Sequence, residues 1–422
     1  MLARILLLLA ALFAVPAAAE TIIVHAGHLL ADSSRPEAGP STITIVDGRI
    51  TAVTAGLQAP PQGARLVDLS AKTVLPGLID AHVHLTAVPG EAFWQEAVNT
   101  DEYYALVGAH NALTTLRAGF TTVRDLGSGP QNGFALRRAI EQGLVPGPRM
   151  LAAGQALSVI GGHGDVSGYR PEVMAALDGH NTCTGADQCA ARVREAARNG
   201  ADVIKFHATG GVLSQGDKSL GQAFSDAEMK AIIDTAHNLG LKVAAHAHAD
   251  AGIAAAVRAG VDSIEHGTFA SPATIRLMKA RGTVLVPTLM AFTGIRERLG
   301  KGIYTPIVED KVRMTLGEVG KAARLAHENG VPIVFGTDAG VYEHGRNAGE
   351  FAELVARAGL SPAEAIASAT TAAAHLLGID SEVGRIAPGF SADLIAVDGD
   401  PLKDVRILEH VDYVMVKGRT AP

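Results

Sequence analysis

Two histidines separated by one residue, His82 and His84, have the clearest chemical potential in this sequence. They follow the turn-forming pair Pro76-Gly77 and a short apolar stretch. On a β-strand, residues i and i+2 project to the same side, so both imidazoles would reach one point. Imidazole nitrogen is a preferred ligand of zinc and related metals. The pair therefore predicts part of a metal site, against the plainer alternative of two polar residues on a wet strand face.

Five further residues suited to a metal site occur at the ends of other short apolar segments. They are Lys205, His246, His248, His266 and Asp338. A set of this kind is a strong signal in a barrel, because the carboxyl ends of the strands meet at one face. Lys205 is unusual, since a charged amine inside an apolar strand is costly to bury unless it is paired or modified.

The segments that carry these residues alternate with helical patterns. Besides the strand of His82, seven segments are predicted as strands: 121–125, 150–155, 202–207, 242–247, 263–266, 283–288 and 332–337. Helices are predicted at 188–199, at 226–239 with Ser225 as N-cap, and at 316–329. Eight such units predict an α/β fold, a (β/α)8 TIM-type barrel over residues 78–380.

Both ends of the chain are rich in β-branched residues and short turns. Strands are predicted at 22–24, 41–46, 49–53, 392–397 and 413–416. Asp47-Gly48 is typical of a hairpin turn between two of them. We therefore expect a β-rich module built from residues 20–77 and 381–422, with Pro76-Gly77 leading from it into the barrel.

The first nineteen residues have the pattern of a secretory signal peptide. Arg4 precedes an apolar run from Ile5 to Val15, and Ala17-Ala18-Ala19 forms a small-residue cleavage site. The run is shorter than the roughly 20 residues that span a bilayer, which disfavours a retained anchor. Residues 1–19 therefore predict export to the periplasm or the medium, with no membrane anchor after cleavage.

Composition excludes some function classes. The formal net charge is −7, and no run of Lys and Arg offers a footprint for nucleic acid. No nucleotide-binding glycine motif or nucleophile elbow is present. The two cysteines, Cys183 and Cys189, lack the partners of a zinc site and leave open a small disulfide loop or two free thiols.

Taken together, these residues resemble the metal-dependent amidohydrolase superfamily. His82-Val83-His84 matches its first-strand motif, and Lys205, His246, His266 and Asp338 match its positions on strands four, five, six and eight. Segments 161–165 and 208–212 resemble the imidazolonepropionase-like branch, which includes Xaa-Pro and other dipeptidases and the ochratoxin-hydrolysing amidohydrolases. The likeness is greatest to this last group, and it implies that the chain-end module is a composite β-sandwich.

The resemblance implies a site with two divalent metal ions, for which zinc is the first expectation. His82 and His84 would hold one ion, and His246 and His266 the other. Lys205 would bridge them as a CO₂-derived carbamate, because a carbamate has two oxygens where an amine has one nitrogen. Asp338 would bind the first ion and act as general base and then acid.

Four residues near these ligands are predicted to contact the substrate: His163, His248, Tyr342 and His344. The leading hypothesis is an enzyme that hydrolyses the amide bond of an N-acyl amino acid or dipeptide, with ochratoxin A-type or Xaa-Pro-type substrates first. One alternative is a cyclic-amide hydrolase of imidazolonepropionase type or a deaminase. A non-catalytic binding protein on the same barrel is a third possibility. The resemblance also implies a homo-oligomer, which could be as large as an octamer.

Overall fold

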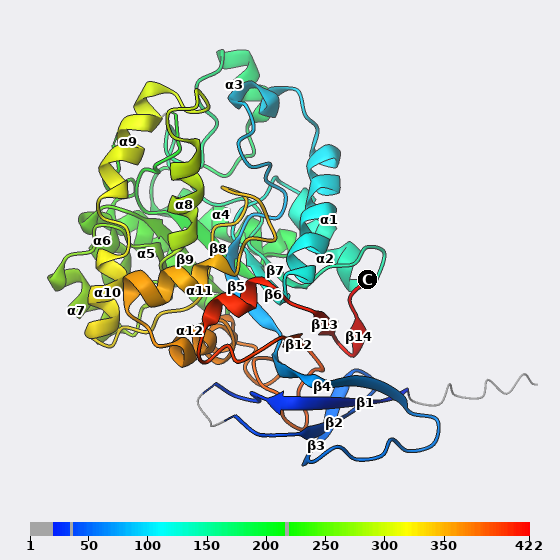
Figure 1. Cartoon of the computed structure of the whole chain (residues 1–422). Helices are drawn as coiled ribbons and strands as arrows, with labels where there is room; N and C mark the ends of the chain where they lie inside the picture. The colour runs from blue at the N-terminus through cyan, green and yellow to red at the C-terminus, as the bar shows by residue number, and fades with distance from the viewer. Residues whose placement is uncertain (1–19, 34–36, 216–218) are drawn as a thin grey trace, which may run out of the picture.

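The structure is a computed structural model that describes residues 20–33, 37–215 and 219–422. The predicted signal peptide at 1–19 lies outside the described residues. Within the described part of the chain, every helix is too short or too polar to cross a membrane. The fold has two parts, a sheet built from both chain ends and a larger body of parallel strands and helices (Figure 1).

The two chain ends meet in one seven-stranded sheet, as the sequence predicts. Its strands are β1 (Thr21–Leu29), β2 (Ser41–Val46), β3 (Arg49–Ala55), β4 (Arg65–Pro76), β12 (Leu394–Val397), β13 (Tyr413–Val416) and β14 (Arg419–Thr420). They lie in the order β14-β13-β12-β4-β1-β2-β3, and β4 joins the two halves by pairing with both β1 and β12.

The hairpin between β2 and β3 has the predicted turn chemistry. Asp47 and Gly48 have φ values of 48° and 75°, as both central residues of a type I′ turn require. The hydrogen bonds make one continuous sheet of this module, so the two facing sheets of the expected β-sandwich are not confirmed.

In the residues that the structure describes, seven parallel strands form two further sheets. One contains β5 (Leu78–Val83), β6 (Phe120–Asp125) and β7 (Arg149–Ala152). The other contains β8 (Val203–His207), β9 (Lys242–Ala247), β10 (Ser263–His266) and β11 (Val284–Val286). Strands such as β8 are buried along their whole length, as expected for parallel strands covered on both faces.

The expected eighth strand differs from its prediction. Residues 332–337 are not assigned as a strand, and the barrel is not closed as one continuous sheet. Isolated parallel bridges still link this segment to its expected neighbours, Leu285 with Ile333 on one side and Val83 with Ala339 on the other. The fold is therefore of TIM-barrel type, but alternating contacts with two neighbours replace a regular ladder at this position.

Helices follow most parallel strands and cover them (Figure 1). The helices are η1 (Phe93–Ala97), α1 (Asp101–Arg117), α2 (Asn132–Glu141), α3 (Pro171–Leu177), α4 (Ala186–Asn199), α5 (Asp226–Asn238), α6 (Asp250–Ala259), α7 (Pro272–Arg281), α8 (Leu289–Arg298), α9 (Pro306–Leu316), α10 (Lys321–Glu328), α11 (Gly349–Glu353), η2 (Leu354–Ala358), α12 (Pro362–Ser368), α13 (Thr371–Leu377) and η3 (Val405–Glu409).

The predicted N-cap of α5 is confirmed. The Ser225 side chain accepts a hydrogen bond from the Glu228 amide, and the Glu228 side chain accepts one from the Ser225 amide. The helix expected at 316–329 is instead the end of α9 followed by α10.

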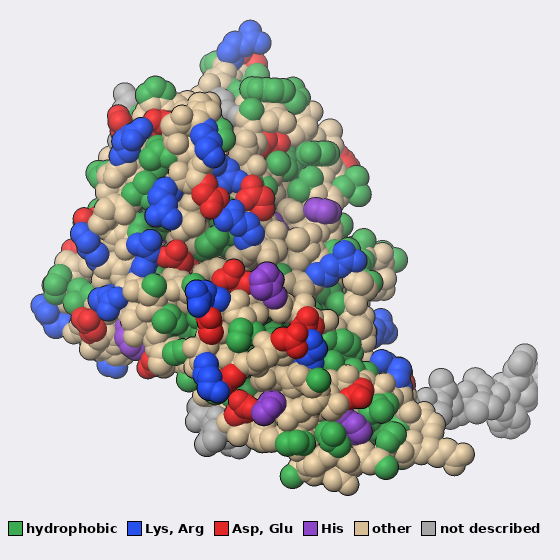
Figure 2. All heavy atoms as spheres, in the orientation of Figure 1, with side chains coloured by type: hydrophobic (Ala, Val, Ile, Leu, Met, Phe, Trp, Pro, Cys, Tyr) green, Lys and Arg blue, Asp and Glu red, His purple; other side chains and the backbone are tan. Residues whose placement is uncertain are grey.

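A buried disulfide and the charged surface complete the fold. Cys183 and Cys189 form a disulfide, which selects between the two alternatives that the sequence leaves open. On the face drawn in Figure 2, basic and acidic side chains are interspersed. Arg346 pairs with Glu297 in this way, so its charge is already matched by a carboxylate.

Gly77 joins the seven-stranded sheet to β5, and the packing around it at this junction is tight. A Cβ at this position would lie 2.1 Å from Thr121 Oγ1 and 2.8 Å from Thr121 Cβ. We predict that Gly77→Ala lowers the free energy of unfolding by about 1–3 kcal/mol, because overpacking displaces the buried Thr121. Urea unfolding measures the change. Gly317→Ala is the matched control, since a Cβ there meets nothing within 4 Å, and equal stability losses in both variants would contradict the prediction.

Candidate metal centre

The carboxyl ends of the parallel strands surround a cavity of about 230 Å³. Every metal ligand predicted from the sequence lines it: His82, His84, Lys205, His246, His266 and Asp338. His82 and His84 come from the end of β5, Lys205 from β8, His246 from β9 and His266 from β10. Strands far apart in the sequence thus bring the chemistry to one place, as in barrel enzymes.

One group of three potential ligands consists of His82, His84 and Asp338, whose donor atoms all lie within 4.8 Å of one another. Asp338 Oδ1 lies 3.4 Å from His82 Nε2 and 3.2 Å from His84 Nε2. Both contacts are longer than the roughly 2.7–2.9 Å of a charge-assisted hydrogen bond. They match the spacing of about 3.3 Å between donors around a tetrahedral ion with bonds of about 2.0–2.1 Å. The three side chains therefore fit a shared metal ion.

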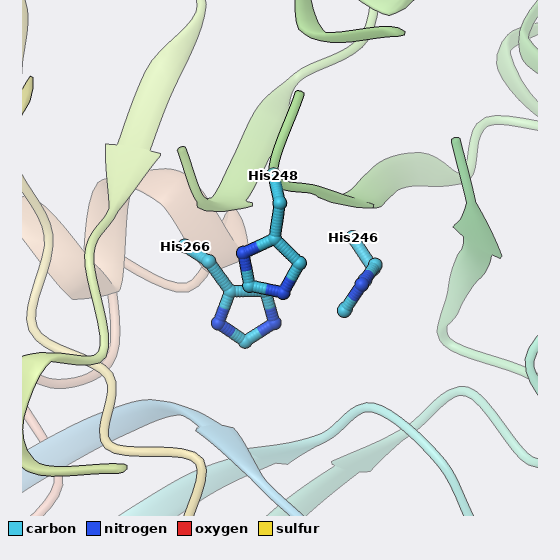
Figure 3. A group of neighbouring side chains, drawn as sticks. All are labelled: His246, His248 and His266. Carbon is cyan, nitrogen blue, oxygen red and sulfur yellow. The ribbon is translucent and has the colours of Figure 1, made fainter. Parts of the chain in front are cut away.

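The second group contains His246, His248 and His266 (Figure 3). The rings of His248 and His266 are stacked, with an interplanar angle of 16° and centroids 4.9 Å apart. A ring nitrogen directs its lone pair in the plane of the ring, so two stacked rings do not converge easily on one ion. His246 and His266 are inclined by 71°, which suits convergence better. His246 is inclined to His248 by 85° as well, so the ring angles allow His246 to share an ion with either histidine, and the choice of His266 rests on the predicted ligand set.

Hydrogen bonds on the opposite ring nitrogens orient these histidines. His84 Nδ1 lies 2.9 Å from the carbonyl oxygen of Gly127, and His266 Nδ1 lies 2.7 Å from Thr288 Oγ1. His82 Nδ1 contacts Glu265 Oε2 at 2.8 Å. Such contacts fix the tautomer and leave Nε2 for a metal, which is the usual arrangement of metal-binding histidines.

Glu265 belongs to a fully buried network that the sequence did not reveal. Its other oxygen accepts hydrogen bonds from Arg124 Nη2 at 3.0 Å and from Ser263 Oγ at 2.6 Å. Burial alone would raise the pKa of Glu265, but Arg124 and the contact with His82 lower it to about 2. The carboxylate is therefore ionised and holds the His82 ring in place. In the sequence, the only sign of this role is that Glu265 directly precedes His266. A single glutamate in a strand does not by itself indicate a role.

The histidines of the centre are mostly neutral, as metal ligands must be. Burial lowers the pKa of His82 to about 4 and places the pKa values of His246 and His266 well below the usual range. His84 is the exception, because the adjacent Asp338 carboxylate outweighs burial and raises its pKa. Burial would raise the pKa of Asp338 itself, but the neighbouring His82 and His84 hold it far below its usual range.

Lys205 lines the cavity beside the first group of ligands. Its Nζ is 3.4 Å from His82 Nε2, and the residue is only 3% exposed. Among the described residues, no Asp or Glu oxygen comes within 4.0 Å of Lys205 Nζ, so the lysine is not held by an ion pair in this part of the chain. Burial lowers its pKa to about 8, which makes the neutral, nucleophilic amine accessible near neutral pH.

The backbone is strained at three positions that follow the parallel segments beside the cavity. His266, Thr288 and Asp338 have φ values of 70°, 49° and 59°, a region that non-glycine residues rarely adopt. Such conformations concentrate at functional sites, where surrounding structure holds them. Asp80 supplies some of that support, because its buried carboxylate accepts hydrogen bonds from the His82 amide, the Thr337 amide and hydroxyl, and Asn347 Nδ2.

The predicted substrate contacts fall into two sets. His163 and His248 line the cavity, and the His163 ring lies 4.4 Å from the His246 ring. Gly211 makes room for His163, because a Cβ there would lie 2.2 Å from His163 Nδ1. His207, an additional cavity residue, is also at the site.

Tyr342 and His344 do not line the cavity, so the arrangement gives their predicted contacts no support. Tyr342 is fully buried, and His344 contacts Thr115 Oγ1 and the carbonyl oxygen of His84.

An apolar wall faces the metal ligands across the cavity. It consists of Val212, Leu213, Ala291, Phe292, Ile295 and Val341. Most of these residues come from α8 and from the loop after β8. A small molecule with an apolar portion would fit against this wall while its polar group meets the histidines.

Comparisons with known proteins agree with this geometry. Residues 73–421 match the Amidohydrolase family. Ochratoxinase from Aspergillus niger is 29% identical over 417 residues, which cover 93% of this chain and 84% of that protein. Its crystal structure aligns with a TM-score of 0.83 at 28% identity and covers 95% of both chains.

Two other solved structures are similar over nearly the whole chain. A Xaa-Pro dipeptidase with methionine bound in the active site aligns with a TM-score of 0.87 at 35% identity, covering 95% of this chain and 99% of that one. A prolidase complexed with N-methylphosphonate-L-proline aligns with a TM-score of 0.86 at 32% identity, with the same two coverages.

The Glu265 network generates a prediction about metal affinity. Glu265→Gln removes the negative charge that orients His82 and should weaken metal binding by about 10–100-fold. Competition with a chelator measures this affinity, and circular dichroism checks that the variant is folded. Glu318→Gln alters an exposed glutamate paired with Lys321 and serves as the control. Unchanged affinity in a folded Glu265→Gln protein would show that the network does not position the ligand.

Proposed function

This chain belongs to the amidohydrolase family and is a hydrolase acting on C–N bonds; we propose that it holds two divalent metal ions and cleaves the amide bond of an N-acyl amino acid or a dipeptide. One observation carries this proposal. Two groups of three potential ligands line a single cavity, and Lys205 Nζ lies 3.4 Å from a donor of the first group. A site for one ion would give the second group and the lysine no role.

The metal ions, when bound, would polarise the scissile carbonyl and supply a nucleophile by lowering the pKa of a bound water. His82, His84 and Asp338 would hold one ion, and His246 with His266 the other. Zinc suits a set dominated by imidazole, although oxygen ligands are compatible with other divalent metals. Lys205 would join the ions as its carbamate, for which its neutral amine is the reactive form.

Asp338 is the proposed general base and acid. Its carboxylate is ionised, because the adjacent histidines hold its pKa low, and its strained backbone aims it into the cavity. It would accept the proton of the attacking water and return it to the leaving amine. His163, which lines the cavity with its ring 4.4 Å from the His246 ring, would donate a hydrogen bond to the substrate carbonyl or the developing oxyanion.

The substrate class is proposed from the relatives and from the cavity wall. Similarity to ochratoxinase and to Xaa-Pro dipeptidase points to an amide whose amine side is a phenylalanine-like residue or proline. The wall formed by Phe292, Ile295 and Val341 suits either apolar side chain. A cyclic amide is the second candidate, because imidazolonepropionase from Ruegeria is 28% identical over 363 residues.

Export and assembly are also proposed. The sequence of residues 1–19 supports a cleaved signal peptide and a periplasmic or secreted protein. The Cys183–Cys189 disulfide is compatible with such an oxidising compartment. A homo-oligomer, up to an octamer, is expected from the resemblance to ochratoxin-hydrolysing amidohydrolases.

A substrate panel tests the activity. Metal-loaded protein should hydrolyse at least one member of a panel of N-acyl amino acids, Xaa-Pro and Xaa-Phe dipeptides, ochratoxin A and lactams. Asp338→Asn should lower kcat/KM on that substrate by at least about 10²-fold, because it removes the proton acceptor. Asp234→Asn, at an exposed residue paired with Lys230, should retain activity. If no amide is cleaved faster by the wild type than by Asp338→Asn, the proposed mechanism is wrong.

A second test concerns the carbamate on Lys205. Lys205→Ala should lose at least about tenfold in metal content and activity, and formate or acetate should restore part of both, because a small carboxylate can occupy the vacated bridging position. Lys230→Ala, at an exposed lysine, is the control and should respond to neither acid. Full metal content in Lys205→Ala without added acid would contradict a bridging role.

The pH dependence of carbamate formation follows from the lowered pKa of Lys205. With a pKa of about 8, the neutral amine is roughly 1% of the lysine at pH 6 and roughly half at pH 8. Wild-type protein stripped of CO₂ should therefore regain activity with metal faster as the pH rises from 6 to 8, when the concentration of dissolved CO₂ is held constant. A rate of recovery that falls over this interval would contradict the assignment.

A further inference from the structure

The start of α8 serves two parts of the site at once. Thr288, the residue before this helix, contacts a predicted metal ligand, because its Oγ1 lies 2.7 Å from His266 Nδ1. Ala291, Phe292 and Ile295 of the same helix belong to the apolar wall of the cavity. Whatever holds the first turn of α8 in place therefore also determines where this ligand and part of the wall lie.

Thr288 occupies the N-cap position of α8 but does not cap the helix. Its hydroxyl group donates a hydrogen bond to the Pro287 carbonyl oxygen at 2.8 Å, which leaves the hydroxyl oxygen to accept one from His266 Nδ1. Within the described chain, the Thr288 side chain accepts no hydrogen bond from the first turn of α8. The first N–H groups of a helix lack partners inside the helix, so those of α8 need acceptors from elsewhere.

Glu350, a fully buried residue of α11, supplies these acceptors. Its Oε1 accepts a hydrogen bond from the Leu289 amide at 2.9 Å, and its Oε2 accepts one from the Met290 amide at 2.6 Å. Burial raises the pKa of Glu350 well above its usual range, and the two amide hydrogen bonds oppose that rise. The hydrogen bonds themselves are therefore what this side chain provides to the start of α8.

The chain around Glu350 is itself held against two other parts of the site. The Phe351 ring packs on the Phe335 ring, in the segment before Asp338, with the ring centroids 4.4 Å apart. Asn347 Nδ2 donates a hydrogen bond to Asp80 Oδ2 on β5 at 2.8 Å. This short stretch of chain therefore connects the start of α8 to the two elements that carry the first group of ligands.

From these contacts we propose that Glu350 is a positioning residue, which fixes the start of α8 so that Thr288 directs the His266 ring toward a metal ion. The proposal rests on the proposed two-metal site and names a residue on which one of the two ions depends. Glu350 does not line the cavity, so it acts through the helix and not on the substrate. Its loss should weaken the ion held by His266 and leave the ion of His82, His84 and Asp338 in place.

Chelator competition on the metal-loaded protein tests this role without substrate. Thr288→Val removes the partner of His266 Nδ1 but keeps the side-chain shape, so it should weaken one ion by about tenfold and thereby identify the His266 site. Glu350→Gln should weaken the same ion by at least about fivefold and the other by less than about twofold, because the amide nitrogen of Gln cannot accept a hydrogen bond from α8. Equal losses for both ions, or full affinity in either variant, would overturn the proposal.

A double variant separates positioning from general destabilisation. If Glu350 acts through Thr288, adding Glu350→Gln to Thr288→Val should weaken the ion by a further factor of less than about two. Losses that multiply would overturn the proposal. Glu364→Gln is the matched control, because Glu364 caps α12, which contributes no residue to the cavity lining. A loss of affinity in this control as large as in Glu350→Gln would also overturn the proposal.

Hydrogen exchange separates this proposal from the proposed activity. Exchange of the Leu289 and Met290 amides requires neither metal nor turnover, and in Glu350→Gln it should be faster by at least about fivefold than in the wild type. Equal exchange rates would overturn the proposal even if the protein hydrolyses amides. A wild type that binds two ions but cleaves no amide would contradict the proposed function, and the comparison of metal affinities would still decide the role of Glu350.

Discussion

The main physical constraint on this structure is electrostatic, because many ionisable side chains are buried around a single cavity. Six predicted ligands line it, and each is at least partly removed from water. A buried charge is costly unless other groups compensate for it. Here the cluster divides its charges: most histidines are neutral because of burial, while the carboxylate of Asp338 remains ionised beside His82 and His84. A metal ion would complete this balance, since it requires neutral imidazoles and anionic oxygens.

The same problem explains features behind the ligands. The buried pair of Arg124 and Glu265 would be a poor device for stability alone, because desolvation offsets most of its attraction. The pair instead holds β5 and its histidine in position. Glu265 contacts His82, and Arg124 also donates a hydrogen bond to the carbonyl oxygen of Ala81, the residue before His82 on β5. The left-handed backbone conformations of His266 and Asp338 are also explained by the positioning of the ligands. Such strain persists only where the surrounding hydrogen bonds hold the backbone in place.

Much of this centre could be predicted because strand periodicity and metal chemistry are both local signals. The alternation of apolar strands with helices located β6 to β11, and histidines at strand ends marked the cavity. Local signals fail where two neighbours share the hydrogen bonds of one segment. Residues 332–337 read as a strand but bond alternately to β11 and β5, which a one-dimensional pattern does not encode.

Other features of the site lie beyond local signals for the same reason. Tyr342 and His344 follow Asp338 closely in sequence, yet the chain turns them away from the cavity into the packing behind it. Glu265 was missed because a single glutamate in a strand shows nothing of the arginine it meets from β6.

The cavity at the strand ends separates the residues suited to chemistry from those suited to selecting a substrate. The ligands stand on strand ends that are fixed by buried hydrogen bonds, so the reacting atoms have little freedom. The apolar wall comes largely from α8 and from the loop after β8, where residues can change without disturbing the strands. The apolar wall therefore favours a substrate with an apolar portion. Because this wall faces the metal ligands, the contacts that select the substrate would also hold its amide bond at the metal centre.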